Sequence, residues 1–418
     1  IQDLKSQTII RVASDDLDAL IQKSLAPIQS QEFVLSIYFG HNLARRHEQL
    51  SQALFKLFQA PFIRAFFSYN EKHRRWQIQN ISPVPASEIP EEHRPFVVQI
   101  ASEYFKLRRA PARRRGGPRY DLAILYDPSE QEAPSNARAL QRFLRAAEAV
   151  GLEAELIEKD DYGRLAEFDA LFIRETTSVN HHTYRFARRA EAEGLVVVDD
   201  PQSILKCTNK VFLAELLEHH HLDAPRTRIV HRENARTVAA DLGLPCILKQ
   251  PDSAFSQGVV KVETEGELAA QVARLLEKSD LIIAQEFLAT DFDWRIGVFD
   301  RQAIYACKYY MARKHWQIVR RDGSGAKAED GRSETLPVEH APSAVVKTAL
   351  RAANLIGDGL YGVDLKQVGK QVYVIEVNDN PSIDAGVEDA VLKDELYLRI
   401  MRVMLRRIEQ KKEKGVWG

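Results

Sequence analysis

The sequence predicts a multidomain protein of mixed α/β and α+β class, and three observations support this fold class. The chain has 418 residues, which is too long for one ordinary domain, so two to four are expected. A stretch rich in Arg, Pro and Gly at residues 108–119 separates a smaller N-terminal segment from the rest. After residue 120, predicted strands and helices alternate, which is typical of a parallel sheet.

The composition argues against several classes of protein. The 58 Lys and Arg residues nearly balance 59 Asp and Glu residues, so no global field draws the chain toward nucleic acid or anionic lipid. Cys207, Cys246 and Cys307 show no CxxC spacing, which predicts reduced thiols in a cytoplasmic protein, not disulfides or a zinc site. No apolar run reaches the roughly 18 residues of a membrane span, and no signal peptide is visible. The chain begins at Ile1 and not at Met, so we expect that its natural N-terminus could be missing.

Residues 1–107 predict a small α+β domain. Apolar alternation indicates three strands, and a periodicity near 3.6 indicates two helices. The strands are expected at residues 33–39, 61–69 and 76–81, and the helices at 43–57 and 90–107. We find no catalytic constellation here, and two roles stay open: recognition of a substrate or partner, and a purely structural one.

The stretch at 108–119 reads RRAPARRRGGPR and predicts an exposed linker. An arm that binds nucleic acid would need aromatic or base-reading neighbours, and the stretch has none. Residues 120–204 then predict a βαβ domain that is Rossmann-like in outline. It lacks the GxGxxG motif, so nothing here calls for a dinucleotide.

Two apolar runs near the C-terminus each carry one acidic side chain. Residues 361–365 (YGVDL) and 371–378 (QVYVIEVN) predict a β-hairpin. A loop at 369–371 would pair Val368 with Val372 and place Asp364 opposite Glu376. Val372, Val374, Glu376 and Asn378 would then share one face of their strand.

Two bare carboxylates at about 4 Å repel each other by roughly 4 kcal/mol at an effective dielectric constant near 20. The expected proximity of Asp364 and Glu376 therefore requires something that offsets this repulsion. A bound divalent cation would do so, and oxygen ligands without His or Cys suit Mg²⁺ or Mn²⁺. The alternative is a surface hairpin whose acids are merely solvated.

A second hairpin is predicted at residues 291–311, with its turn at 299–302. A two-residue loop would place Asp293, Arg295 and Lys308 on one face, which suits a nucleotide and an anionic substrate. A surface ion pair between Asp293 and Lys308 is the alternative. The polar, glycine-containing residues 312–332 predict a mobile loop that could close over a charged site.

Two lysines lie where a phosphate could bind. Lys210 is in the first turn of a helix that Thr208 is expected to cap, and a cation there opposes the helix dipole. Either this position of Lys210 has no functional meaning, or its side chain is directed at a phosphate. Lys249 ends a strand and precedes a loop of small and hydroxyl residues at 252–258, whose backbone amides could hold phosphates.

In chain order these features resemble the ATP-grasp superfamily, and within it the RimK-like amino-acid ligases. The resemblance covers roughly residues 120–410, and its most specific part is GVD at 362–364 with EVNDNP at 376–381. It implies the ATP-grasp fold: a pre-ATP-grasp domain at 120–204, a small subdomain at 205–288 and a large subdomain at 289–418. The N-terminal domain resembles the accessory domain fused to some RimK-like proteins.

The resemblance also implies roles for individual residues. The ATP-binding residues would be Lys210, Lys249, Ser253, Ser256, Gly258, Gln285, Glu286, Phe287 and Asp293, with the lysines on phosphates, the linker at 286–287 on adenine and Asp293 on ribose. The Mg²⁺ (or Mn²⁺) ligands would be Asp364, Glu376 and Asn378. Arg295 and Lys308 would face the γ-phosphate or an acyl phosphate.

The reaction implied is that of an ATP-dependent carboxylate–amine ligase, which joins a glutamate-like amino acid to an amino acid, peptide or protein. Two departures leave glutamate open as the donor: the loop at 253–258 has less glycine than family loops often have, and residues 308–332 lack an arginine-rich pattern. Two alternatives are a nucleotide-regulated ATP-binding protein that holds a partner without turnover, and an RNA-binding protein that uses Arg113, Arg114 and Arg115. The oligomeric state is open, a homo-oligomer included.

Overall fold

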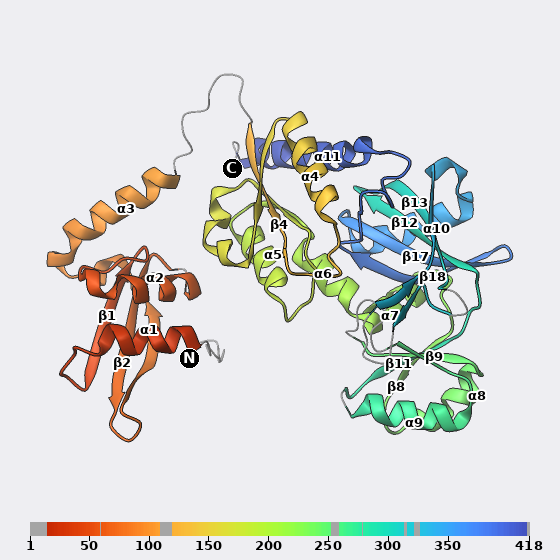
Figure 1. Ribbon diagram of the computed structural model, residues 1–418, viewed down its shortest axis with the longest axis horizontal. Coiled ribbons are helices and arrows are strands. Elements are labelled where there is room, and N and C mark those ends of the chain that lie inside the picture. The colour runs from red at the N-terminus through yellow and green to blue at the C-terminus, as the bar shows by residue number, and fades with distance from the viewer. Residues whose placement is uncertain are drawn as a thin grey trace. The chain divides into compact units, whose positions relative to one another are not determined.

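The computed structural model describes residues 15–58, 60–108, 119–251, 259–277, 279–312, 316–321 and 327–415. The chain divides into two compact units, residues 1–116 and 117–418 (Figure 1). Residues 109–118 of the predicted linker lie outside the described part. Within that part, no helix combines the length and the apolar character that a membrane span requires.

The first unit is a small α+β domain, as predicted, built on an antiparallel three-stranded sheet, and its helix at residues 15–25 was not predicted. Its strands β1 (Glu32–Tyr38), β2 (Phe62–Asn70) and β3 (Arg75–Pro83) pair in chain order. Helices α1 (Asp15–Leu25) and α2 (Glu48–Leu57) share one buried apolar cluster with the sheet, in which Leu25 and Leu54 join Ile37. Helix α3 (Arg94–Arg108) follows and buries Val97 in a smaller cluster with Tyr38.

The second unit begins with a parallel sheet of the order β5-β4-β6-β7. Its strands are β4 (Tyr120–Leu125), β5 (Leu152–Ile157), β6 (Ala170–Ile173) and β7 (Val196–Val198), and its helices are α4 (Ala137–Ala149) and α5 (His182–Ala192). The C-terminal helix α11 (Asp394–Gly415) lies beside α4 (Figure 1), and both bury apolar side chains in one core with β4.

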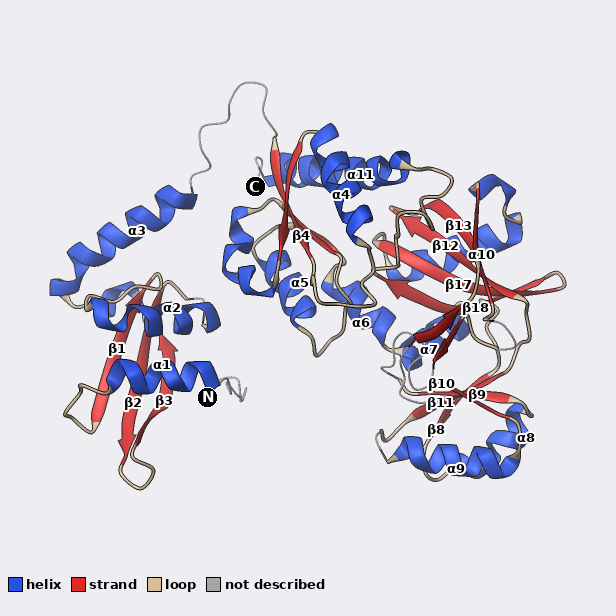
Figure 2. Cartoon of the chain, viewed as in Figure 1, coloured by secondary structure: helices blue, strands red, loops and turns tan. Residues whose placement is uncertain are grey.

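A smaller antiparallel sheet of the order β10-β9-β11-β8 follows, formed by β8 (Thr227–Val230), β9 (Cys246–Lys249), β10 (Val259–Val262) and β11 (Ile282–Glu286). Helices α8 (Val238–Leu242) and α9 (Glu265–Leu276) cover one of its faces (Figure 2). A capping box begins α9, because the Thr264 side chain accepts from the Glu267 amide and the Glu267 side chain accepts from the Thr264 amide. Lys249 and Gln285 lie on the opposite face of the sheet, which these two helices do not cover.

The largest sheet is antiparallel and has the order β16-β13-β12-β17-β18. Its strands are β12 (Phe292–Phe299), β13 (Gln302–Tyr310), β16 (Ser333–Leu336), β17 (Leu360–Val368) and β18 (Gln371–Asp379). Helices α7 (Lys210–His219) and α10 (Ser343–Ile356) pack apolar side chains against one face, and α6 (Pro201–Thr208) precedes α7. Part of the loop predicted at 312–332 is instead a two-stranded ribbon of β14 (Val319–Arg321) and β15 (Lys327–Asp330).

The turn of the β17–β18 hairpin is one residue shorter than predicted. It consists of Gly369 and Lys370, so Val368 pairs with Gln371 and the prediction that it pairs with Val372 is wrong. Gly369 adopts a φ of +62°, which a glycine tolerates at the first position of a two-residue hairpin turn.

A β-bulge then restores the predicted pairing farther along the same hairpin. Ile375 is an extra residue in β18, and beyond it Asp364 pairs with Glu376 as predicted. Three valines of β18 share the buried cluster beneath α10: Val372, Val374 and Val377. The prediction that Val372 and Val374 share the face of Glu376 is therefore wrong, because the bulge reverses the alternation between them.

A second bulge changes the β12–β13 hairpin. Its two-residue loop, Asp300 and Arg301, is confirmed, and both residues have the positive φ that such a turn requires. Gly297 pairs with Tyr305 while Val298 pairs with Ala303, so β13 carries one extra residue between them. Every side chain of β13 beyond this point lies on the face opposite to the predicted one.

Candidate active site

The face of the large sheet that α10 leaves uncovered carries the three predicted metal ligands. Asp364 on β17 and Glu376 on β18 are cross-strand neighbours, and Asn378 follows on the same face. The Asn378 Nδ2 atom lies 3.1 Å from Oδ2 of Asp364. The structure therefore brings together the two carboxylates and the amide that the sequence pattern singled out.

Arg295 reaches this group from the neighbouring strand β12, where it pairs directly with Asp364. Its Nε and Nη2 atoms donate to the two oxygens of Asp364 at 2.7 and 2.8 Å, a bidentate arrangement. Burial acts to lower the pKa of the Arg295 guanidinium, but the Asp364 carboxylate outweighs it and holds that pKa well above its usual range. Arg295 stays a fixed cation beside the predicted metal ligands.

Lys210 contributes a second cation from the start of α7. The cap of this helix is Asn209 and not Thr208 as predicted, because the Asn209 side chain accepts from the amides of Val211 and Phe212 while Thr208 ends α6. The Lys210 Nζ atom lies 2.6 Å from Oε1 of Glu376. Burial acts to raise the pKa of Glu376, but the ammonium groups of Lys210 and Lys249 outweigh it, so this pKa lies below its ordinary value.

Lys249 lies at the end of β9, as predicted, on the face of the small sheet away from its helices. Its Nζ atom donates to Oε1 of Gln285 at 2.9 Å, and Nε2 of Gln285 donates in turn to Oγ1 of Thr227. Burial lowers the pKa of Lys249, and the Glu376 carboxylate opposes this shift. The small sheet thus offers a cation and an amide to the same site.

A third lysine, Lys366, belongs to the site and was missed by the sequence analysis. Its Nζ atom lies 2.5 Å from Oδ1 of Asp293 and 2.7 Å from Oγ1 of Thr290. Burial raises the pKa of Asp293, and the Lys366 ammonium opposes this. The signal was present, since Lys366 lies two positions beyond Asp364 and strand alternation puts both on one face.

Lys308 lies on the other face of the sheet, and the prediction that it joins Arg295 is wrong. Its Nζ atom is 5.2 Å from the centroid of the Trp294 ring and 3.9 Å from Oε2 of Glu334. The physical reason is the extra residue in β13, which turns Lys308 toward the cross-strand neighbour Trp294.

The predicted adenine-binding residues lie at the end of β11. The Glu286 carboxylate accepts from the backbone amide and the Nε atom of Arg226, both at 2.8 Å. The Phe287 ring lies 6.1 Å from the Trp316 ring and 4.5 Å from Nζ of Lys261. The predicted phosphate-loop residues Ser253, Ser256 and Gly258 lie outside the described residues.

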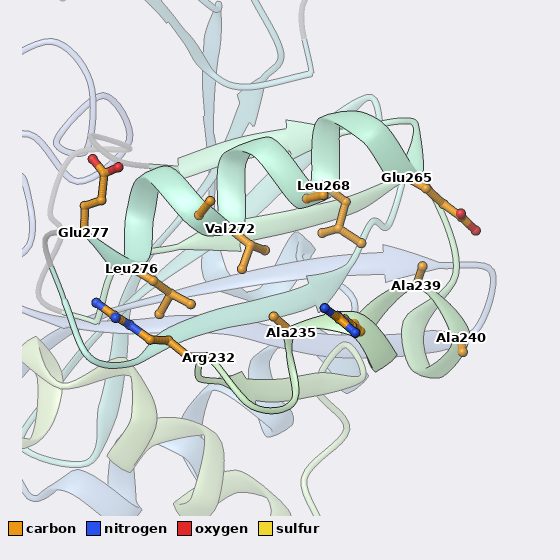
Figure 3. A pocket seen from close by; sticks show the side chains of 12 residues that line it. Arg232, Ala235, Ala239, Ala240, Glu265, Leu268, Val272, Leu276 and Glu277 are labelled. Carbon is orange, nitrogen blue, oxygen red and sulfur yellow. The ribbon is translucent and has the colours of Figure 1, made fainter.

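A large hollow lies apart from these residues, beside the sheet formed by β8, β9, β10 and β11. It has a volume of about 760 Å³ and lies between α9 and the segment that leads into α8 (Figure 3). Leu268, Val272 and Leu276 line it, and Arg232 and Glu277 lie at its rim. None of the predicted site residues lines it, since it is on the helix-covered side of this sheet.

The site combines three carboxylates with four cations. Each carboxylate faces a cation of the chain: Asp364 faces Arg295, Glu376 faces Lys210, and Asp293 faces Lys366. Oxygen donors from Asp364, Glu376 and Asn378 fit a hard cation such as Mg²⁺, which prefers carboxylate and amide oxygens to nitrogen or sulfur. The excess of cations suits a ligand that carries several negative charges, such as a triphosphate.

Comparisons with protein families match two parts of the chain. A model of the RimK-like ATP-grasp domain matches residues 207–395, and a model of the RimK-like ATPgrasp N-terminal domain matches residues 1–100. Relatives include a probable alpha-L-glutamate ligase of Vibrio vulnificus (strain YJ016), 26% identical over 62% of this chain and 89% of that protein. A probable alpha-L-glutamate ligase 1 of Pseudoalteromonas atlantica is 27% identical over 60% of this chain and 79% of that protein.

Two solved structures have a fold similar to that of this chain. The D-alanine–D-alanine ligase of Bacillus anthracis in complex with ATP has a TM-score of 0.53 and 16% identity, and covers 71% of this chain and 99% of that one. A RimK domain ATP-grasp protein of Sphaerobacter thermophilus has a TM-score of 0.51 and 18% identity, and covers 68% of this chain and 98% of that one. These matches confirm the predicted ATP-grasp fold.

Proposed function

The chain belongs to the RimK-like ATP-grasp family, and from this premise we propose that it is an ATP-dependent carboxylate–amine ligase. The observation that carries the proposal is the convergence of Asp364, Glu376 and Asn378 on one face of the large sheet, next to Arg295, Lys210 and Lys249. The relatives are named as glutamate ligases, which supports a glutamate-like amino acid as one substrate. The other is an amino acid, a peptide or a protein.

The residues of the site divide among the parts of ATP. Lys210 and Lys249 bind phosphates, Asp293 binds ribose with Lys366 holding its carboxylate in place, and the 286–287 segment borders adenine. Arg295 faces the γ-phosphate or the acyl phosphate. A Mg²⁺ (or Mn²⁺) ion held by Asp364, Glu376 and Asn378 would supply further neutralisation of phosphate charge.

The chemistry requires positioning and charge neutralisation, and no nucleophile from the protein. A carboxylate oxygen of one substrate attacks the γ-phosphorus of ATP, and ADP leaves. The amine nitrogen of the second substrate then attacks the acyl carbon, phosphate leaves and the nitrogen loses a proton. The products are an amide, ADP and phosphate.

The proposal includes an arrangement of domains and a location. We assign residues 120–204 to the pre-ATP-grasp domain, 205–288 to the small subdomain, 289–418 to the large subdomain, and residues 1–107 to an accessory domain. The three cysteines are free and buried, which supports a reducing compartment, and we propose the cytoplasm.

The decisive experiment incubates the protein with ATP, Mg²⁺ and pools of amino acids and peptides, and follows ADP release and new amide masses. We expect turnover that Glu376→Gln abolishes while the fold stays intact. Glu334→Gln is the matched control, because Glu334 pairs with Lys308 on the opposite face of the sheet. Nucleotide binding without ADP release from any pool would favour a regulatory ATP-binding protein, and full turnover in Glu376→Gln would refute the metal assignment.

A further inference from the structure

Three side chains outside the proposed ATP site converge in the loop between β6 and α5. Glu175 follows β6 by two positions, His181 precedes α5 and His182 is its first residue. The Nε2 atoms of His182 and His181 lie 2.6 and 3.7 Å from Oε1 of Glu175. Ligand atoms of all three residues lie within 4.8 Å of one another.

Two buried polar atoms of this cluster have no hydrogen-bond partner in the part of the chain that the structure describes. The Glu175 residue is 2% exposed, yet its Oε2 atom has no hydrogen-bond partner among the described residues. The buried Nε2 atom of His182 likewise has no hydrogen-bond partner within that part of the chain, although it lies 2.6 Å from Oε1 of Glu175. Buried polar atoms are normally paired, since leaving one unpaired costs about 1–3 kcal/mol. A metal ion bound to Nε2 of His182 would give that atom a partner, and a Glu175 carboxylate that binds the ion through both oxygens would do the same for Oε2.

We propose that Glu175, His181 and His182 bind a divalent cation of the zinc class. Two imidazole nitrogens and one carboxylate oxygen are a usual set of three protein ligands for Zn²⁺, with a fourth position left for water or a substrate group. Tetrahedral ligands at about 2.0–2.1 Å from the metal would lie roughly 3.3 Å from one another. The contacts of 2.6 and 3.7 Å bracket that value, and no two of the three ligand atoms are more than 4.8 Å apart.

This site differs from the proposed magnesium site in chemistry but contacts the same strand. The proposed magnesium ligands are all oxygen atoms, whereas imidazole nitrogen selects zinc-class metals over Mg²⁺. The backbone oxygen of Glu175 accepts from Nδ2 of Asn380 at 2.5 Å, and Oγ1 of Thr177 donates to Oδ2 of Asp379 at 2.7 Å. A metal here would therefore fix the loop against the end of β18.

The test measures metal binding by the full chain, stripped with chelator and kept in excess Mg²⁺ without nucleotide. We expect roughly one Zn²⁺ per chain by calorimetry and elemental analysis, and a four-coordinate absorption spectrum with Co²⁺. The double substitution His181→Ala with His182→Ala should remove this metal, and Glu175→Gln should weaken its binding. The matched control replaces His219 and His220 by Ala, because they are also adjacent but exposed at the end of α7.

Zinc retained at full stoichiometry by the His181/His182 variant, or no zinc bound by the wild type, would overturn the proposal. Equal loss in the His219/His220 control would do the same. If the double variant fails to fold, as judged by circular dichroism, the Co²⁺ spectrum of the wild type against that of Glu175→Gln decides. The readout involves neither ATP nor turnover, so its outcome is independent of the ligase proposal.

Discussion

Lys210 and Glu376 are 166 positions apart in the chain, yet Nζ of one lies 2.6 Å from Oε1 of the other. The contact joins the start of α7 to β18. A proposed phosphate-binding cation is thus paired with a proposed metal ligand, and Arg295 with Asp364 repeats this pattern. Lys366 is paired in the same way with Asp293, the proposed ribose ligand. Each carboxylate of the site has a cationic partner within the chain, so binding of the proposed magnesium–nucleotide complex would exchange these partners without leaving a buried carboxylate unpaired.

Replacement of Lys210 by Met should weaken nucleotide binding. The substitution removes a proposed phosphate contact and leaves Glu376 without its closest cation. We therefore expect the Kd for a non-hydrolysable ATP analogue with Mg²⁺ to rise at least tenfold, or about 1.4 kcal/mol. Calorimetric titration measures this. The control is Lys206→Met, because the Lys206 ammonium donates to the backbone oxygen of Ile356 and not to a site carboxylate. Equal affinities in the two variants would contradict the assignment of Lys210.

Lys366 and Lys308 provide a direct test of strand orientation. Lys366 contacts Asp293 on the site face, whereas Lys308 lies against Trp294 on the other. We expect Lys366→Met to raise the KM for ATP by about tenfold or more, because the carboxylate of Asp293, which we propose binds ribose, loses its partner. Lys308→Met should stay close to wild type in steady-state kinetics. The reverse order of effects would show that the side chains of β13 are oriented as the sequence alone predicted.

Lys366 and Lys308 also show which features of strand pairing the sequence predicts and which it does not. Hydrophobic alternation located both hairpins, and the pairing of Asp364 with Glu376 was predicted correctly. Alternation has a period of two and contains no signal for an inserted residue, so a bulge is invisible to it. In the β17–β18 hairpin the shorter turn and the extra Ile375 cancel, which preserved the prediction. In the other hairpin nothing compensates the extra residue of β13, and Lys308 was placed on the wrong face.

The long-range contacts were beyond reach for a different reason. Lys210 and Lys249 were singled out by their places at a helix start and a strand end, which are local features. The proximity of Lys249 to Glu376 depends on how two sheets face each other, and that of Lys210 depends on how α7 packs against the large sheet. No local pattern encodes either arrangement. The cluster of Glu175 with His181 and His182 was missed because a strand end and a helix start meet there only in the folded loop.

Two glycines should respond oppositely to replacement by Ala. A Cβ atom at Gly297 would overlap the buried ring of its cross-strand neighbour Tyr305, so Gly297→Ala should lower the free energy of unfolding by about 1–3 kcal/mol. Gly266 lies in the first turn of α9 with open space around it. Gly266→Ala should therefore raise the free energy of unfolding by about 0.5–1 kcal/mol. Denaturant titrations of both variants measure this, and equal effects would contradict the packing at Gly297.

The three thiols should be unreactive in the folded protein. Cys207, Cys246 and Cys307 are all buried, and burial raises the pKa of each, that of Cys307 to about 12. The reactive thiolate is therefore scarce at pH 8, and a reagent reaches it only when the structure opens. We expect a disulfide reagent such as DTNB to label none of them within minutes at pH 8 and all three in denaturant. Rapid labelling of the native protein would mean that a thiol is exposed and that the packing around it is looser than the structure shows.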